Sequence, residues 1–254
     1  MIVPQTSIIL PVYNEADSLP VLWAELVPVL AQLPGPAEVI IVDDGSTDAS
    51  AEVARRLAQA DARVRLVRLG ANAGLTAALL AGFAAARGDR VVTMDSDLQY
   101  DASDIPRLLS LLDRHDAALG WRGRRQDTWT KRISSRIANG LRSAVLGDAV
   151  RDSACTLRAM RRPCLAAILP YHGMHRFVPT LLAHAGARMI EVEVRHRPRR
   201  YGASKFGIRN RALRVLIDLL AVRWMRSRRV VYSVIEDTGH DRAHTPRKEG
   251  QESP

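Results

Sequence analysis

The stretch EVIIVDDGS, residues 38–46, is an apolar run that ends abruptly in two carboxylates, a glycine and a serine. Its four consecutive β-branched residues predict a strand that is buried on both faces, and its polar end predicts a tight turn. Thr47 or Asp48 is placed to cap a helix over Ala49–Gln59 directly after that turn. A buried strand followed at once by a helix is the repeating unit of a parallel α/β sheet.

The same alternation of strand and helix patterns runs through the first 120 residues. The expected strands are Ser7–Val12, Glu38–Val42, Val64–Leu69, Arg90–Met94 and Ala117–Leu119. The expected helices are Ser18–Leu33, Ala49–Gln59, Leu75–Ala86 and a segment from Ser103 or Asp104 to Arg114. Because parallel strands are joined by right-handed crossovers, the pattern predicts the α/β class, with a mostly parallel sheet and helices on both faces.

Arginine-rich helices replace this alternation after residue 121. The expected elements are helices Trp129–Leu146, Arg176–Ala185 and Arg209–Met225, a strand Met189–Arg195 and a loop Arg197–Gly202. We expect residues 1–235 to form a single domain with two lobes, 1–120 and 121–235. Residues 236–254 are polar and poor in apolar side chains, which predicts a disordered tail.

The charge of the chain is divided unevenly between these parts. The 254 residues carry 37 Lys and Arg and 27 Asp and Glu, a net charge of +10. Residues 1–120 hold 9 basic and 16 acidic side chains, and residues 121–254 hold 28 and 11, so the two parts carry −7 and +17. This asymmetry predicts that the acidic half binds a cation and that the basic half binds anions. The alternative is a basic surface that only aids solubility.

Composition and patterning exclude several classes of protein. Apolar residues at 47% and charged residues at 25% exclude wholesale disorder. Two cysteines are too few for a disulfide scaffold or a cysteine zinc site. The arginines are not interleaved with aromatic residues, and we find no zinc-finger, RNA-recognition or helix-turn-helix signature, so we expect no nucleic-acid partner. No apolar stretch reaches the roughly 20 residues of a spanning helix, and we find no secretion signal, so we expect a soluble or peripheral protein.

Polar residues follow three of the expected strands. They are Tyr13-Asn14-Glu15, Asp43-Asp44 and Asp95-Ser96-Asp97. Ligands of parallel sheets bind beyond the carboxyl ends of the strands, so these residues are the first candidates for a site. Asp95 and Asp97 are one residue apart and can approach one hard cation, with Gln99 as a source of an amide oxygen. Oxygen ligands of this kind suit Mg²⁺ or Mn²⁺, and an ordinary acidic turn is the alternative.

Taken together, PVYNE at 11–15, VDDGS at 42–46 and MDSDLQ at 94–99 resemble glycosyltransferase family 2. The GT-A fold of that family is an α/β sheet that binds a nucleotide-diphospho-sugar. Three later segments are GWRGRRQD at 120–127, Asp152 to Arg158, and RRYGASKF at 199–206. They narrow the resemblance to dolichyl-phosphate mannosyltransferases and bacterial polyprenyl-phosphate glycosyltransferases, over about residues 5–225.

The resemblance implies a role for each matching residue. It implies a nucleotide-sugar and metal lobe over 1–120 and a basic acceptor lobe over 121–235. The implied donor-pocket residues are Pro11, Tyr13, Glu15, Val42 and Asp44. The residues that hold metal and diphosphate are Asp95, Ser96, Asp97 and Gln99, with Asp95, Asp97 and Gln99 as metal ligands. The residues that meet donor or acceptor phosphate are Arg122, Arg136, Arg199 and Lys205, and the implied catalytic residues are Asp97, Arg122 and Lys205.

Plainer interpretations remain open for several of these residues. Tyr13 can be a core residue, Asp43-Asp44 a turn with a helix cap, and Arg136 part of a helix surface. His172 and His175 have helical spacing, but Gly173 lies between them and we find no third ligand, so we interpret them as structural.

The function that the resemblance implies is inverting, metal-dependent transfer of a sugar from a GDP- or UDP-linked donor to a polyprenyl phosphate. A phosphate monoester is largely a dianion at pH 7, so we name no general base. Two alternatives stay open: transfer to a hydroxyl acceptor in cell-surface polysaccharide synthesis, and a non-catalytic nucleotide-sugar-binding adaptor.

The implied location is the cytoplasm, peripherally on the inner face of the membrane. Leu213, Leu216, Ile217, Leu220 and Trp224 form one stripe of the helix Arg209–Met225, with arginines around it. Such a helix can lie on an anionic bilayer, and the alternative is a core-facing helix with a basic solvent face. A membrane-protein partner is a further expectation, because many bacterial relatives carry membrane helices after this region.

Overall fold

The computed structural model describes residues 3–123, 140, 142–148, 150–199 and 211–228. The strands are β1 (Thr6–Val12), β2 (Ala37–Asp43), β3 (Val64–Arg68), β4 (Arg90–Thr93), β5 (Ala117–Trp121), β6 (Arg158–Arg161) and β7 (Met189–Glu193). The α-helices are α1 (Ser18–Gln32), α2 (Ser50–Ala60), α3 (Leu75–Ala85), α4 (Ile105–Ser110), α6 (Val178–His184) and α7 (Arg211–Ser227), and residues 142–146 are helical as well. Short 3₁₀ turns cover Ala102–Asp104, Leu111–Asp113, Arg162–Ala167 and Met174–Arg176.

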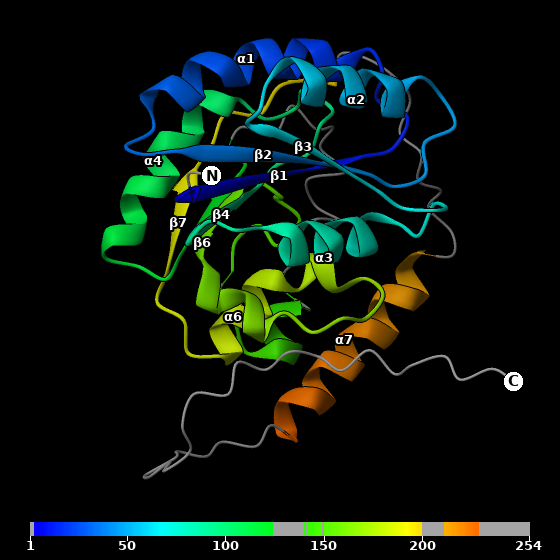
Figure 1. The fold of residues 1–254 in the computed structure, drawn as a ribbon. Coiled ribbons are helices and arrows are strands. Elements are labelled where there is room, and N and C mark those ends of the chain that lie inside the picture. Colours follow the sequence, from blue (N-terminus) through cyan, green and yellow to red (C-terminus); the bar gives the residue numbers. More distant parts are fainter. Residues whose placement is uncertain (1–2, 124–139, 141, 149, 200–210, 229–254) are drawn as a thin grey trace, which may run out of the picture.

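The strands form one seven-stranded sheet in the order β3-β2-β1-β4-β6-β5-β7 (Figure 1). β1 lies between β2 and β4 and is parallel to both, and β6 is antiparallel to both of its neighbours. β6 and β7 follow residue 121 in the chain, yet they extend the sheet that β1–β5 begin. The predicted α/β class with a mostly parallel sheet is confirmed.

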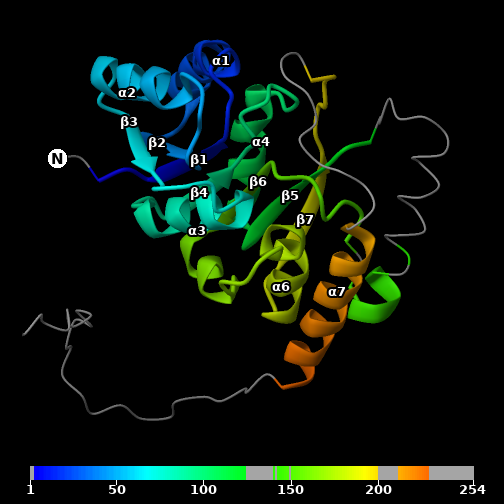
Figure 2. The same ribbon diagram turned by 90° about the vertical axis from the view of Figure 1, so that its right-hand side faces the viewer.

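Helices cover both faces of this sheet because its central strands are apolar on both faces. Every residue of β1 is buried. Ile8, Leu10 and Val12 pack with α1, α2 and α4, whereas Ile9 packs with α3, α6 and α7 on the opposite face. This alternation is the two-residue period of a strand. Figure 2 shows α7 beside α6 and apart from α1 and α2.

Two elements differ from the sequence prediction. The helix expected from Ser103 or Asp104 to Arg114 is divided into a 3₁₀ turn, the short α4 and a second 3₁₀ turn. β6 was not predicted, and it pairs with β4 in the register Thr93↔Arg158. The predicted tail over 236–254 and most of the helix expected over Trp129–Leu146 lie outside the described residues. Within the described ranges, no helix combines the length and the apolarity that crossing a bilayer requires.

Candidate active site

The carboxyl ends of β1, β2 and β4 meet at one edge of the sheet because the three strands are parallel neighbours. Val12, the last residue of β1, is paired with Asp43 of β2. The hydroxyl of Ser96, just after β4, donates to the carbonyl of Pro11 at 2.8 Å. The three polar segments that follow these strands therefore come together, as expected for a ligand site of a parallel sheet.

The turns after β1 and β4 contain non-glycine residues with left-handed backbone conformations. Asn14 has φ of 54° and Leu98 has φ of 63°. Asparagine tolerates this region, and the Asn14 side chain accepts the backbone N–H of Thr47 at 2.8 Å. Leucine does not favour it, and Leu98 is held there by burial in the core. Such strain costs about 1–3 kcal/mol and collects at functional sites, so it marks this edge of the sheet as a candidate site.

Asp95 and Asp97 form a carboxylate pair after β4. Burial of Asp95, followed by the charge of Asp97, raises the pKa of Asp95 from its ordinary 3.8 to about 6. The neighbouring Thr156, Arg158 and Arg122 offset part of that rise. Burial thus disfavours the charged form of Asp95. A divalent cation bound by its carboxylate would favour that form.

The donors at this position fit Mg²⁺ or Mn²⁺. Among the described residues no group of three His, Cys, Asp or Glu side chains is arranged to hold a metal ion. A cation here would take carboxylate oxygens from Asp95 and Asp97 and would complete its shell with the Gln99 amide, water or substrate oxygens. Hard cations that keep several non-protein oxygens are bound in this way.

Arg199 connects this carboxylate pair with β1. Its Nη2 lies 2.9 Å from Asp97 Oδ2 and 3.3 Å from Glu15 Oε1. The second oxygen of Glu15 accepts the Ser18 hydroxyl at 2.8 Å, which fixes that carboxylate. All three charged side chains are largely shielded from solvent, with 26%, 11% and 9% of Arg199, Asp97 and Glu15 exposed. The Arg199 guanidinium thus bridges two carboxylates, one that follows β1 and one that follows β4.

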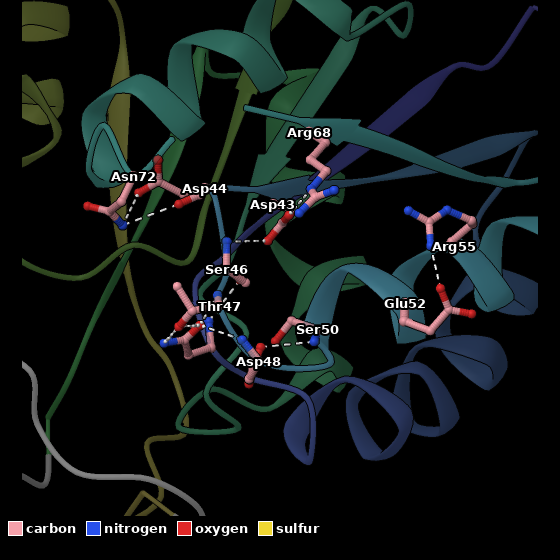
Figure 3. A network of polar contacts seen from close by, with 11 residues as sticks. Asp43, Asp44, Ser46, Thr47, Asp48, Ser50, Glu52, Arg55, Arg68 and Asn72 are labelled. Atoms are coloured by element: carbon pink, nitrogen blue, oxygen red, sulfur yellow. Dashed lines mark hydrogen bonds and ion pairs between the residues drawn. The ribbon is translucent and has the colours of Figure 1, made fainter. Parts of the chain in front are cut away.

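Asp43 and Asp44, at the end of β2, have separate partners (Figure 3). Asp43 accepts Arg68 Nε and the backbone N–H of Ser46, both at 3.1 Å. Asp44 holds the loop before α3. It accepts the amide of Asn72 at 3.1 Å and the backbone N–H groups of residues 73 and 74 at 2.8 and 2.9 Å.

Arg122 lies directly after β5 and forms a two-pronged ion pair with Asp152. Its Nε and Nη2 lie 2.8 and 2.9 Å from the two carboxylate oxygens. Burial lowers the pKa of Arg122, but the bonds to Asp152 and the neighbouring acidic groups together outweigh this and hold it above its ordinary value. Arg158 of β6 is buried and donates to the carbonyls of Ser153 and His175. Arg122 and Arg158 therefore place fixed positive charge beside Asp95.

Comparison with known proteins decides the family. Residues 7–169 match the family model described as glycosyl transferase family 2. The chain belongs to this family. An undecaprenyl-phosphate 4-deoxy-4-formamido-L-arabinose transferase from Edwardsiella ictaluri is 38% identical over 216 residues, which are 84% of this chain and 66% of the relative. A dodecaprenyl-phosphate galacturonate synthase from Rhizobium johnstonii is 38% identical over 224 residues, which are 86% of this chain and 66% of the relative. The chain thus spans just under two thirds of the length of these family 2 relatives.

A solved structure shares the fold of this family 2 chain. The glucosyl-3-phosphoglycerate synthase of Mycobacterium tuberculosis, in complex with Mn²⁺, uridine diphosphate and glucosyl-3-phosphoglycerate, has a TM-score of 0.64. The match covers 93% of this chain and 82% of that chain at 22% identity. The likeness supports the fold alone, and the predicted GT-A fold is confirmed.

The structure brings some of the predicted site residues together. Glu15, Asp97 and Arg199 are in direct contact, and Ser96 is bonded to Pro11. Tyr13 lies at the same strand end and is half-buried. The side chain of Val42 is fully buried in the core on the α3 face, so a nucleotide contact by Val42 would come from its backbone. Arg136 and Lys205 lie outside the described residues, and their roles stay predictions.

Sequence reasoning missed three contributions to the site. Asp152 and Arg158 are marked in the sequence only by a resemblance. Arg158 is positioned by the pairing of β6 with β4, and Asp152 lies in the segment before β6. The loop at Asn72, which Asp44 holds, had no assigned role. Its signal was Gly74 directly before an apolar helix, a position with φ of 88° that favours glycine.

Proposed function

We propose that this chain transfers a sugar from a nucleotide-diphospho-sugar to a polyprenyl phosphate, with Mg²⁺ or Mn²⁺ and with inversion at the anomeric carbon. The observation that carries the proposal is the meeting of the Asp95–Asp97 pair with Arg199 at the ends of β1 and β4. The named activities of the 38% identical relatives support the choice of acceptor. A cation beside Asp95 and Asp97 would neutralise charge that develops on the departing nucleoside diphosphate.

The residues of the chain then have positioning and electrostatic roles. The acceptor phosphate is largely a dianion at pH 7, because its second pKa is about 6, so it needs no base to attack the sugar. It needs cations that hold it against the donor diphosphate. Arg199 is suited to the donor side of this arrangement, because a guanidinium can bind two oxygens of the diphosphate at once. Arg122, locked by Asp152, would add to the local positive potential.

A comparison of acceptors tests the proposal. The purified chain would be incubated with Mn²⁺, a panel of UDP- and GDP-sugars, and one of three acceptors: a short polyprenyl phosphate, the matching polyprenol or an oligosaccharide. We expect a sugar-linked lipid only with the phosphate, and an inverted anomeric configuration in its NMR spectrum. Transfer to the polyprenol or to an oligosaccharide would support the hydroxyl-acceptor alternative. Absence of transfer from every donor to every acceptor would support the adaptor.

We propose further that the enzyme works at the cytoplasmic face of a membrane and contacts it through α7. Leu219 and Val222 of this helix are buried against α6 and its neighbours. The opposite face of α7 carries large apolar side chains that are exposed to solvent. They are Leu216, Ile217, Leu220 and Trp224, exposed by 43%, 57%, 55% and 62%.

The geometry of α7 supports a bilayer surface over a core-facing role. Successive residues of a helix are about 100° apart around its axis. The four exposed side chains therefore fall within an arc of about 100°. Arg223 and Arg228 are exposed at the two margins of that stripe, which suits the negatively charged inner leaflet. The side chain of Leu213, the fifth member of the predicted stripe, lies outside the described residues.

Vesicle binding tests this contact. Replacing Ile217 and Leu220 by serine should reduce partitioning onto phosphatidylglycerol vesicles by about 10-fold or more, because each buried side chain contributes on the order of 1 kcal/mol. Val27→Ser is the matched control, since Val27 is 38% exposed on α1, on the other side of the sheet. Equal binding by both variants, or equal binding to neutral vesicles, would contradict the contact. A requirement for a membrane-protein partner would appear as weak vesicle binding by the wild type.

A further inference from the structure

We propose that Arg199 is a charge gate on the cation site: it holds Asp97 and Glu15 until the donor diphosphate draws it away, so that cation and nucleotide bind cooperatively. This inference rests on the proposed function and adds a regulation of the same site. Arg199 lies in the segment that follows β7 and pairs with the residues after β4.

The backbone places Arg199 opposite Asp97. The N–H of Arg197 donates to the carbonyl of Gln99 at 2.7 Å, and Tyr100 forms an antiparallel bridge with His196. In an antiparallel pair, each step forward on one strand is a step back on the other. Two residues beyond the Gln99–Arg197 pair, the same register brings Asp97 across from Arg199.

This segment is anchored without the side chain of Arg199. Arg197 forms ion pairs with Glu25 at 2.8 Å and Asp101 at 2.7 Å. The backbone N–H of Arg195 donates to Asp104 at 2.8 Å. The Arg199 guanidinium can therefore change partners while the backbone that carries it stays in place.

The side chain also has room to move. Arg199 lines a hollow of about 320 Å³ together with Glu25, Leu98, Arg197 and Pro198. Its partners, by contrast, are confined: the second oxygen of Asp97 accepts the backbone N–H of Gln99 at 3.2 Å, and Glu15 is held by Ser18. A rearrangement at this contact would thus be a movement of Arg199.

Electrostatics gives the contact two states. Asp97 Oδ2 bonds to Arg199 at 2.9 Å, and a cation bound by Asp97 would lie beside that guanidinium and repel it. A diphosphate offers the guanidinium two oxygens in place of one from each carboxylate. Arg199 on the carboxylates therefore opposes the cation, whereas Arg199 on the diphosphate permits it. By linkage, the nucleotide then increases cation affinity, and the cation increases nucleotide affinity by the same factor.

Calorimetric titration tests the gate with MnCl₂ alone, with the nucleoside diphosphate alone (UDP or GDP, whichever the wild type binds more tightly), and with each in the presence of the other. Arg199→Gln should bind Mn²⁺ alone about 5- to 10-fold more tightly than the wild type, and the mutual enhancement by Mn²⁺ and nucleotide should fall by the same factor. Arg195→Gln is the matched control from the same segment, because the Arg195 side chain is 70% exposed and the variant keeps the backbone N–H that bonds to Asp104. It should leave both quantities unchanged. Arg199→Lys keeps the charge and should bind Mn²⁺ alone as the wild type does.

The opposite results would overturn the gate. If Arg199 only braces Asp97, Arg199→Gln binds Mn²⁺ alone no more tightly than the wild type and keeps the mutual enhancement. If Arg199→Lys binds Mn²⁺ like Arg199→Gln, charge is not the cause. These titrations need neither acceptor nor turnover. Cooperative binding without sugar transfer would thus refute the proposed function alone, and transfer without cooperative binding would refute the gate alone.

Discussion

Replacing Asp95 by asparagine should stabilise the metal-free protein, and the gain should increase with pH. Asp95 has a pKa of about 6 in the folded chain and an ordinary value of 3.8, because it is buried and lies near Asp97. Below pH 3.8 the carboxyl is protonated in both the folded and the unfolded state, so it costs nothing. Above pH 6 it is ionised in both states, and folding must bury its charge. Asparagine keeps the shape of the side chain and carries no charge.

The size of the effect follows from the two pKa values. The difference between about 6 and 3.8 corresponds to about 3 kcal/mol, at 1.36 kcal/mol per pKa unit. The cost is complete by about pH 8. It is about half as large near pH 5, where the unfolded carboxyl is mostly ionised and the folded one is mostly protonated. The stability that a protonated Asp95 retains is therefore lost as the pH rises from about 4 to about 6.

Urea unfolding in excess chelator at pH 5 and pH 8 measures this gain. Asp95→Asn should raise the free energy of unfolding by about 3 kcal/mol at pH 8 and by about 1.5 kcal/mol at pH 5. Asp101→Asn is the control with the opposite sign. Although burial raises the pKa of Asp101, bonds from Ser103 and Arg197 hold it below its usual range, so its neutralisation should destabilise the protein at pH 8. A gain for Asp95→Asn that is absent, or equal at the two pH values, would refute the reasoning.

Three other substitutions separate roles within the site. Asp97→Ala should leave the circular dichroism spectrum intact and abolish transfer; full activity, or turnover unaffected by excess chelator, would remove the cation from the mechanism. Asp152→Ala should lower the free energy of unfolding by about 3 kcal/mol in urea, because it leaves Arg122 largely buried without its two-pronged partner; a loss below about 1 kcal/mol would contradict this. Asp44→Ala should speed hydrogen exchange of the backbone amides of residues 73 and 74, just before α3, and raise the donor KM more than it lowers kcat. Unchanged exchange would show that Asp44 does not hold that loop.

The central strands and their polar ends could be predicted from the sequence because local residues determine them. The apolar runs are Ile8–Val12 in β1 and Val39–Val42 in β2, and an asparagine or a carboxylate follows each within two positions. A strand buried on both faces needs such a run, and the polar residues must then leave the core. The location of the candidate site followed from these two facts and the parallel class of the sheet.

Other features depend on pairings between distant residues. β6 has the sequence RAMR, with two arginines in four residues, and it is a strand because β4 and β5 both bond to it. The contact of Arg199 with Asp97 depends on a register set about 100 residues apart in the chain. α4 ends after six residues, where a 3₁₀ turn follows it, although Pro106 suits the first turn of a helix. No local pattern specifies these outcomes.

The site lies where the acidic and basic halves of the chain meet, and the basic half supplies two kinds of positive charge. Arg158 is fixed, because β6 buries it beside β4 and its guanidinium is bonded to backbone carbonyls. Arg199 lies above the strand ends, beside a hollow, and its partners are carboxylates that a cation also seeks. The fixed charge of Arg158 acts on Asp95 in the same way whether or not a nucleotide is bound. Arg158 therefore cannot distinguish a cation alone from a cation with its nucleotide. In the proposed gate a side chain that exchanges carboxylate for phosphate can make this distinction, which gives Arg199 a role that the buried Arg158 cannot fill.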